Sequence, residues 1–420
     1  MSFNPLRAAN LLKLLSFPRL AGTEGEVRAR EIIVGELKSY GYEPGLEEFE
    51  LKVFEVEEAS LEVLEPWKEQ VECSGVGFSG STPPEGVEAE FKYVETGDRA
   101  LLPSREGLIL LASRRPDLEL YKNLMKVKPA GIVVAESSPY RRLSHVGVMS
   151  EWRRHGSAPM VYVRFEDAYR MVECGARRVR LKLLQREWIT KSCNIVVEKK
   201  GLKYPEEEVV VCAHYDSVYG VPGATDNAGG TAFLLELARV FSSKSVKRTL
   251  RFIAFSGEEL GLRGSLAHVE RRKATLENVK MVVNLDVHGG SVGFNRAVVT
   301  GPPQVRQYLE VMAKKLGYNL AVSEDVYSSD SSSFAKAGVP AVSFSRSSGA
   351  SAGIHSLDDD GRFTGTAGYA TIGPLVVEFI ELLVNSEEFP FPREIPEELR
   401  KKVDEYFTKR LGIEESGEEN

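Results

Sequence analysis

The residues best suited to chemistry lie in residues 209–230, which read VVVCAHYDSVYGVPGATDNAGG. The apolar, β-branched start predicts a strand buried on both faces, and His214 and Asp216 follow where that strand should end. Ligands of open α/β sheets bind at the carboxyl ends of the strands, so both residues are suitably placed for a site. The imidazole can bind a metal while the carboxylate holds its other ring nitrogen, and Asp226 offers a further oxygen ligand. The structural alternative is a polar strand end followed by an ordinary helix cap at Asp226.

Three more groups of polar side chains follow predicted strands in the second half of the chain. They are Glu258 and Glu259 after 250–255, Asp286 after 279–285, and His355 in the loop after 341–344. Two divalent cations can be held by five of these side chains if one carboxylate bridges: His214, Asp226, Glu259, Asp286 and His355. The mixture of imidazole and carboxylate suits zinc, and cobalt or manganese are alternatives. Each residue alone is also explained as a helix-start carboxylate, a cap or a loop histidine.

The elements that must position these side chains alternate regularly after residue 188. Strands are expected at 193–197, 209–213, 250–255, 279–285, 297–299 and 341–344. Helices are expected at 231–241, 259–271, 303–316, 332–337 and 366–384. This alternation predicts an α/β fold, with a mostly parallel mixed sheet and helices on both faces.

A change in the pattern of predicted strands and helices divides the chain. Residues 53–187 read as short strands separated by turns, and none of these strands ends in a cluster of metal-type residues. We therefore expect a catalytic domain made of 1–52 and 188–390, interrupted by a β-rich α+β insert without chemistry of its own. Residues 391–420 are expected to form a charged helix and an acidic, disordered tail.

The composition excludes several classes of protein. The 420 residues are 42% hydrophobic and 27% charged, as in ordinary globular proteins. A net charge of -7 without a basic run argues against a nucleic-acid partner. The N-terminus lacks a continuous signal-peptide core, and we expect no membrane-spanning stretch. A cytoplasmic location without a membrane partner is predicted, and a homo-oligomer is left open.

The motifs HYDS, GATDNAGG, FSGEELGLRGS, NLD and GIHS occur in this order. In combination they closely resemble the co-catalytic di-zinc aminopeptidases, a family that also contains glutamate carboxypeptidase-like enzymes and glutaminyl cyclases. The resemblance covers about 1–52 and 188–385, including the start PRLAGTEGEVRAREIIVGELKSYGYE. It implies a zinc exopeptidase-like fold, and the insert resembles the protease-associated domain that many members carry.

The resemblance also implies a role for each residue. One zinc ion would be held by His214 and Asp286, the other by Glu259 and His355, with Asp226 as the bridge. Asp216 would orient His214, and Glu258 would be the general base. Two such ions can activate water and polarise the scissile carbonyl, while the base transfers the proton to the leaving amine.

Two positions depart from the family pattern. Ile354 precedes His355 where a polar aromatic residue is frequent, and Ser331 follows Asp330 where the family often has histidine. His288, near Asp286 in the sequence, could compensate, although a core or surface histidine is the simpler interpretation. These departures concern the choice of substrate more than hydrolysis.

The leading interpretation is a metal-dependent aminopeptidase acting on peptide substrates with a free N-terminus. The alternative is a carboxypeptidase of the same fold, which needs a cation for the substrate carboxylate, with Arg263 and Arg346 as candidates. A glutaminyl cyclase would work with one metal, and a receptor-like binding module would have lost the ligands. The full set of ligands disfavours both.

Overall fold

The computed structural model describes residues 1–413, which form two units. The first unit consists of Met1–Leu51, Thr190–Ile354 and Asp359–Tyr406. The second consists of Lys52–Ile189, His355–Asp358 and, of the residues after 406, the described ones 407–413. The chain changes units inside two long strands, β1 (Gly45–Glu65) and β8 (Arg178–Lys199). The acidic tail predicted to be disordered falls mostly on 414–420, outside the described residues.

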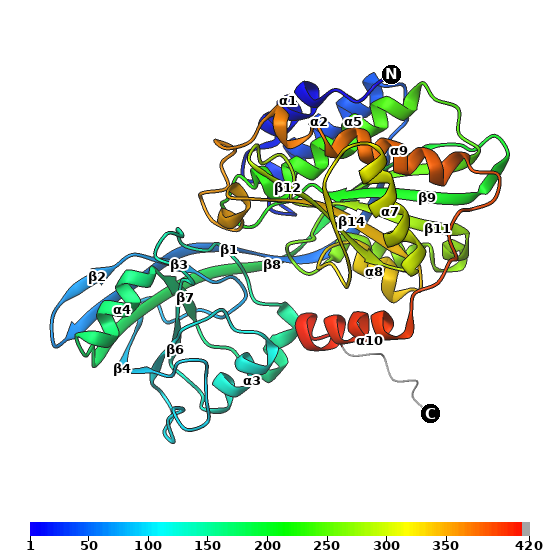
Figure 1. The fold of residues 1–420 in the computed structure, drawn as a ribbon. Helices are drawn as coiled ribbons and strands as arrows, with labels where there is room; N and C mark the ends of the chain where they lie inside the picture. Colours follow the sequence, from blue (N-terminus) through cyan, green and yellow to red (C-terminus); the bar gives the residue numbers. More distant parts are fainter. Residues whose placement is uncertain (414–420) are drawn as a thin grey trace. The chain divides into compact units, whose positions relative to one another are not determined.

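The first unit is built on a mixed sheet with the strand order β13-β12-β14-β11-β9-β10-β8 (Figure 1). Its further strands are β9 (Tyr204–His214), β10 (Arg248–Phe255), β11 (Val279–Leu285), β12 (Gly293–Thr300), β13 (Leu320–Glu324) and β14 (Ala341–Ser348). Strands β10, β9, β11 and β14 run parallel, whereas β8 and β12 are antiparallel to their neighbours β10 and β14. The predicted α/β fold class is confirmed.

Helices cover both faces of this sheet. They are α1 (Pro5–Leu15), α2 (Glu24–Ser39), α5 (Gly229–Ser242), α6 (Arg263–Arg271), α7 (Pro303–Lys315), α8 (Ser331–Lys336) and α9 (Ile372–Asn385). A further helix, α10 (Glu397–Glu405), packs against α8. Val209 and Val211 of β9 share one core with α1, α2, α5, α7 and α9. Val210 and Cys212 pack in the opposite core with Phe334 of α8. The two-residue period of a strand thus buries β9 on both faces, as its apolar run predicted.

Strand β13 and the starts of α6 and α9 differ from expectation. Helix α9 begins at Ile372 and not at 366. Strand β13 was not predicted, because its residues are only partly buried and lack a strong apolar pattern. Helix α6 begins at Arg263 and not at 259. The preceding residues Gly257, Gly261 and Leu262 have φ angles of 72°, 100° and 60°, a left-handed backbone that cannot continue an α-helix.

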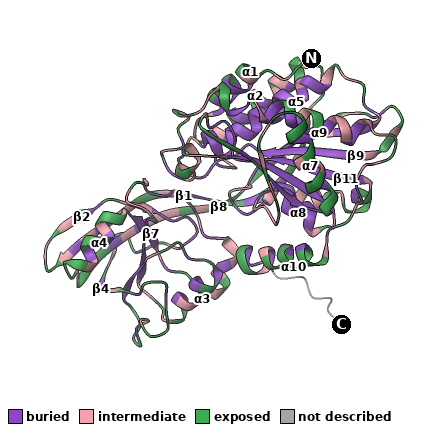
Figure 2. Ribbon diagram, in the orientation of Figure 1, coloured by how far each residue is buried: buried purple, intermediate pink, exposed green. Residues whose placement is uncertain are grey.

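One helical segment of the described chain, Thr366–Asn385, which combines a short 3-10 helix (Thr366–Gly368) with α9, is long and apolar enough to cross a membrane by length and composition. The expectation that no stretch has this character is therefore wrong. Of its most apolar window, 56% is buried, and Leu375, Val376 and Phe379 belong to the core of the first unit. Figure 2 colours the ribbon of α9, like the rest of the chain, by burial. A core helix that is apolar on most sides gives the same signal.

The second unit contains a smaller sheet. Its strands are β2 (Glu69–Val71), β3 (Cys73–Gly75), β4 (Val87–Tyr93), β5 (Ile109–Ala112), β6 (Gly131–Ala135) and β7 (Met160–Val163), with the adjoining parts of β1 and β8. Strands β4, β5, β6 and β7 are parallel; α3 (Leu118–Lys126) lies between β5 and β6, and α4 (Phe165–Glu173) lies between β7 and β8. Leu111, Val133 and Val161 lie in its apolar core. The unit is therefore an α+β structure rich in strands.

Candidate metal centre

Three of the strands that carry candidate ligands end at the same edge of the sheet. His214 is the last residue of β9 and lies opposite Phe255, the last residue of the parallel strand β10. Asp286 comes directly after β11, which is the parallel neighbour on the other side of β9. Because parallel strands present their carboxyl ends together, this topology gathers polar side chains from distant parts of the sequence.

The His214 ring lies between carboxylates. Its Nε2 is 3.2 Å from Asp226 Oδ1 and 3.4 Å from Asp286 Oδ1, and its Nδ1 is 3.4 Å from Asp216 Oδ1. All four residues are buried. One ring nitrogen therefore faces two oxygens suited to a shared cation, and the other faces a carboxylate suited to orient the ring.

Glu258 and Glu259 lie in the turn before α6 and not on the helix. Their backbone N–H groups donate to the Asp216 carboxylate, at 3.2 and 3.3 Å. One potential ligand atom from each glutamate lies within 4.8 Å of a ring nitrogen of His214. Asp216 therefore contacts both the imidazole of His214 and the turn that carries the glutamates, and fixes their positions relative to each other.

The loop that carries Asp226 is fixed by Asp359. The Asp359 carboxylate accepts hydrogen bonds from Thr225 N and Oγ1 at 2.7 and 2.8 Å, and from Asp226 N at 3.0 Å. This positioning residue was missed, because an aspartate 133 residues away along the chain carries no local signal of its partner.

The paired glycines after this loop explain how α5 comes so close to the end of β11. A Cβ atom on Gly230 would lie 2.2 Å from Asn227 Oδ1 and 2.3 Å from the carbonyl oxygen of Leu285. No side chain fits there, so glycine is required for the close approach. The approach places the Asp226 loop beside the residue that follows Leu285, which is Asp286.

A buried arginine from the N-terminal segment supports the loop after β9. Arg19 donates from its guanidinium to the carbonyl oxygens of Tyr215 and Gly223, at 2.6 and 2.8 Å, and to those of Phe17 and Pro222. Burial lowers the pKa of Arg19 to about 10, although nearby carboxylates oppose this shift, so the group stays charged at neutral pH. Arg19, which lies in the segment PRLAG, thus places a positive charge against the loop that follows β9.

The electrostatics of the site are dominated by crowded acidic groups. Burial and the like charges of Glu259 and Asp286 raise the pKa of Glu258 well above its usual value, with His214 opposing. Burial lowers the pKa of His214, whereas the carboxylates around it, Glu258 among them, raise it. The carboxylates have the larger effect, so the pKa of His214 lies well above its usual value. Without a bound cation, the acidic side chains of this site therefore carry more negative charge than its basic side chains neutralise.

This donor set fits a divalent cation. Asp286 Oδ1 is buried and accepts no hydrogen bond within residues 1–413, which costs free energy unless a cation occupies the space beside it. Imidazole nitrogen with carboxylate oxygen is a combination typical of zinc. His214, Asp226 and Asp286 would hold such an ion, because their ligand atoms lie within 4.8 Å of one another.

Two further polar residues border the cluster. Burial raises the pKa of Asp330 to about 7, and both its carboxylate oxygens lack hydrogen-bond partners within the described chain. Burial and the charges of Asp286 and Asp226 raise the pKa of Tyr327 well above its usual value. The Tyr327 hydroxyl therefore stays protonated and can donate to a negatively charged oxygen. Tyr327 was missed, although it lies only three residues before Asp330.

The residues that depart from the family pattern have structural roles in the first unit. His288 is buried, its Nε2 lies 2.9 Å from the carbonyl oxygen of Phe344, and its ring meets Phe233 edge-on. Burial lowers the pKa of His288 to about 3, so it is a neutral core histidine. Ser331 Oγ is hydrogen-bonded to Ser343 Oγ at 2.9 Å. His288 is thus not the compensating residue that the sequence allowed.

His355 lies in the segment His355–Asp358, which belongs to the second unit. The geometry of the first unit therefore does not include it, and its role as a ligand stays a prediction. Its backbone has a φ angle of 64°, a left-handed conformation that few residues other than glycine adopt.

The sheet brings a cluster of imidazole and carboxylate groups together at the carboxyl ends of its parallel strands. Residues 194–380 match the model of peptidase family M28. The match begins in β8 and ends in α9, so it contains every predicted ligand.

Relatives with two different specificities are similar to this chain. Bovine carboxypeptidase Q is 30% identical over 290 residues, which cover 64% of this chain and 61% of that protein. Aminopeptidase YwaD of Bacillus subtilis is 27% identical over 348 residues, which cover 78% and 72%. The structure of a zinc aminopeptidase from Bacillus subtilis has a TM-score of 0.76 at 24% identity, covering 94% and 99%, and shares the fold.

Proposed function

We propose that this protein is a metal-dependent exopeptidase that removes N-terminal residues from peptides. The observation that carries the proposal is the position of His214 Nε2 between Asp226 and Asp286, with Glu258 beside them. The match to peptidase family M28 and the similarity to an aminopeptidase support the same reaction.

The proposed cofactor is a pair of zinc ions. His214 and Asp286 would hold one, Glu259 and His355 the other, and Asp226 would bridge them. The nitrogen and oxygen donors favour zinc, and cobalt or manganese remain alternatives that metal analysis of the purified protein distinguishes. When bound, zinc supplies Lewis acidity that activates a water molecule and polarises the scissile carbonyl.

The chain's own residues account for the proton transfers. Glu258 would accept a proton from the attacking water and deliver it to the nitrogen of the leaving group. Asp216 holds the backbone of Glu258.

The carboxypeptidase alternative is favoured by the relatives named carboxypeptidase Q. However, the two arginines that the sequence offered for a substrate carboxylate have other partners. Arg346 is buried and donates to the carbonyl oxygens of Gly290 and Ser291 and to Asn295 Oδ1. Arg263 Nε donates to the carbonyl oxygen of Leu260. This engagement supports an aminopeptidase.

Blocking the two ends of a peptide tests which end is recognised. We expect N-terminal acetylation to abolish hydrolysis and C-terminal amidation to change it little, because the acidic cluster suits a substrate ammonium group. Cleavage products of one tripeptide in its free, acetylated and amidated forms can be quantified by mass spectrometry. If only the amidated form resists cleavage, the enzyme is a carboxypeptidase.

We also propose that the second unit is a protease-associated-like module that restricts the length of the substrate. With a metal-replete enzyme, kcat/KM should fall from dipeptides and tripeptides to long or folded substrates. Equal values for a tripeptide and for the N-terminus of a folded protein would contradict this role. The cytoplasmic location stays a proposal, which fractionation of the source cells tests.

A further inference from the structure

The second unit contains a short segment that contacts the backbone of a predicted ligand. The amide of His145 donates to the carbonyl oxygen of His355 at 2.8 Å, and Ser144 pairs with Ser356 in an antiparallel bridge. Arg142 Nε also lies 3.5 Å from Asp358 Oδ1. The four residues His355–Asp358 are therefore attached to residues 142–145 through backbone and side-chain contacts.

Residues 144–148 are themselves firmly anchored. At one end, the buried carboxylate of Glu136, just after β6, accepts the amide of Ser144 at 2.6 Å and pairs with Arg141 at 3.2 Å. At the other end, Gly77 donates to the carbonyl of Val146 and accepts from the amide of Val148, both at 3.0 Å.

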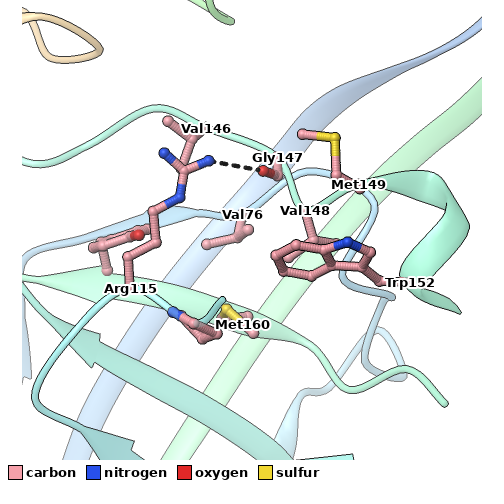
Figure 3. A pocket seen from close by; sticks show the side chains of 10 residues that line it. Val76, Arg115, Val146, Gly147, Val148, Met149, Trp152 and Met160 are labelled. Atoms are coloured by element: carbon pink, nitrogen blue, oxygen red, sulfur yellow. Dashed lines mark hydrogen bonds between the residues drawn. The ribbon is translucent and has the colours of Figure 1, made fainter. Parts of the chain in front are cut away.

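The same segment forms one wall of a small hollow in the second unit, shown in Figure 3. Arg115 reaches the carbonyl oxygen of Gly147 at 3.5 Å, and the Trp152 ring lies beside Val148. Val146 and Val148 are buried. Buried side chains and backbone pairing thus restrict the movement of the segment that holds His355.

A left-handed backbone at a histidine needs such support. A non-glycine residue with a φ angle of 64° persists when its surroundings fix it, and these residues cluster at functional sites. Ligand distances to zinc tolerate only a few tenths of an ångström. A change of the His355 backbone would therefore displace its imidazole from any ion that it binds.

We infer that the second unit positions the metal ligand His355 through residues 144–148 and is thereby required for the second metal site. The inference rests on the proposed function, in which His355 is a ligand. It also goes beyond it, because the insert was expected to contribute no part of the metal site. Residues 144–148 act through His355 and are positioning residues.

The decisive comparison is between His145→Pro and His145→Ala. Proline removes the N–H that donates to His355, whereas alanine keeps it. The bridge residue Ser144 is extended, which is the conformation that a residue before proline prefers. Zinc titration of the metal-free proteins by calorimetry should show about 10–100-fold weaker binding of one ion in His145→Pro, as for other outer-shell changes. His145→Ala should bind both ions like the parent.

Two binding steps of parental strength in a folded His145→Pro would overturn the inference, as would equal weakening in His145→Ala. If the proline variant does not fold, Glu136 provides a second pair. Glu136→Gln keeps an oxygen that can accept the Ser144 amide and should bind both ions, whereas Glu136→Ala should weaken one. Equal zinc binding by these two variants would also contradict the positioning role.

His355→Ala separates this inference from the proposed function. It should reduce the zinc content from two ions to one. If His355→Ala retains both ions, the proposed set of ligands is wrong. If it loses one ion while His145→Pro and Glu136→Ala keep both, only the positioning role fails.

Discussion

Glu258→Gln should lower kcat by at least about 10²–10⁴-fold, the usual contribution of a general base, while zinc content and melting temperature stay near parental values. The amide cannot accept the proton of the attacking water. The backbone of the residue remains held by Asp216, because that contact uses the main-chain N–H. Initial rates on an unblocked tripeptide, with zinc measured by mass spectrometry on the same sample, test this result.

The matched control for this prediction is Glu270→Gln. Glu270 lies on α6, its side chain is 78% exposed, and its contact with Lys273 is 3.9 Å. This variant should keep the parental rate. Near-normal turnover in zinc-loaded Glu258→Gln would exclude Glu258 as the base.

Asp226→Asn should lower both zinc content and turnover. Asp226 is the proposed bridge, so the loss of its negative charge weakens both ions at once. Asp359 holds the backbone N–H of Asp226, and that contact survives the substitution, so charge changes while the loop keeps its place. We expect at least the 10–100-fold loss of metal affinity that is typical of outer-shell changes.

Asp404→Asn is the control for Asp226→Asn. Asp404 forms a surface ion pair with Lys336, at 2.7 Å with half of its side chain exposed. Such pairs are worth only about 0–1 kcal/mol. If Asp226→Asn binds two zinc ions as tightly as the parent, Asp226 does not bridge.

The parts of the site that the sequence predicts are those that depend on local pattern. The apolar runs of β9, β10 and β11 mark buried strands, and polar residues directly after them must lie at one edge of a parallel sheet. His214 and Asp286 are therefore expected side by side, and their side chains lie 3.4 Å apart. The relation between Asp216 and His214 followed from their spacing in the same way.

The parts that escaped prediction depend on tertiary contacts without a local pattern. Asp359 and Arg19 hold backbone groups of loops more than a hundred residues away, and any polar side chain of suitable length could do so. The late start of α6 depends on Leu262, a non-glycine residue in a left-handed conformation. The membership of His355 in the second unit depends on backbone hydrogen bonds, which no residue type specifies.

The contacts of Arg19 affect the order in which parts of the chain can fold during synthesis. The guanidinium leaves the ribosome about 200 residues before the carbonyl groups of Pro222 and Gly223 that it satisfies. Helices α1 and α2 can likewise reach their final packing only after α5 has been made, because they share a core with it. The loop after β9 therefore takes its final conformation only after a long segment has been made, and such distant contacts slow folding. Residues 194–380, which match the family model, lack Arg19 and the helices α1 and α2, whose side chains complete the core of the first unit.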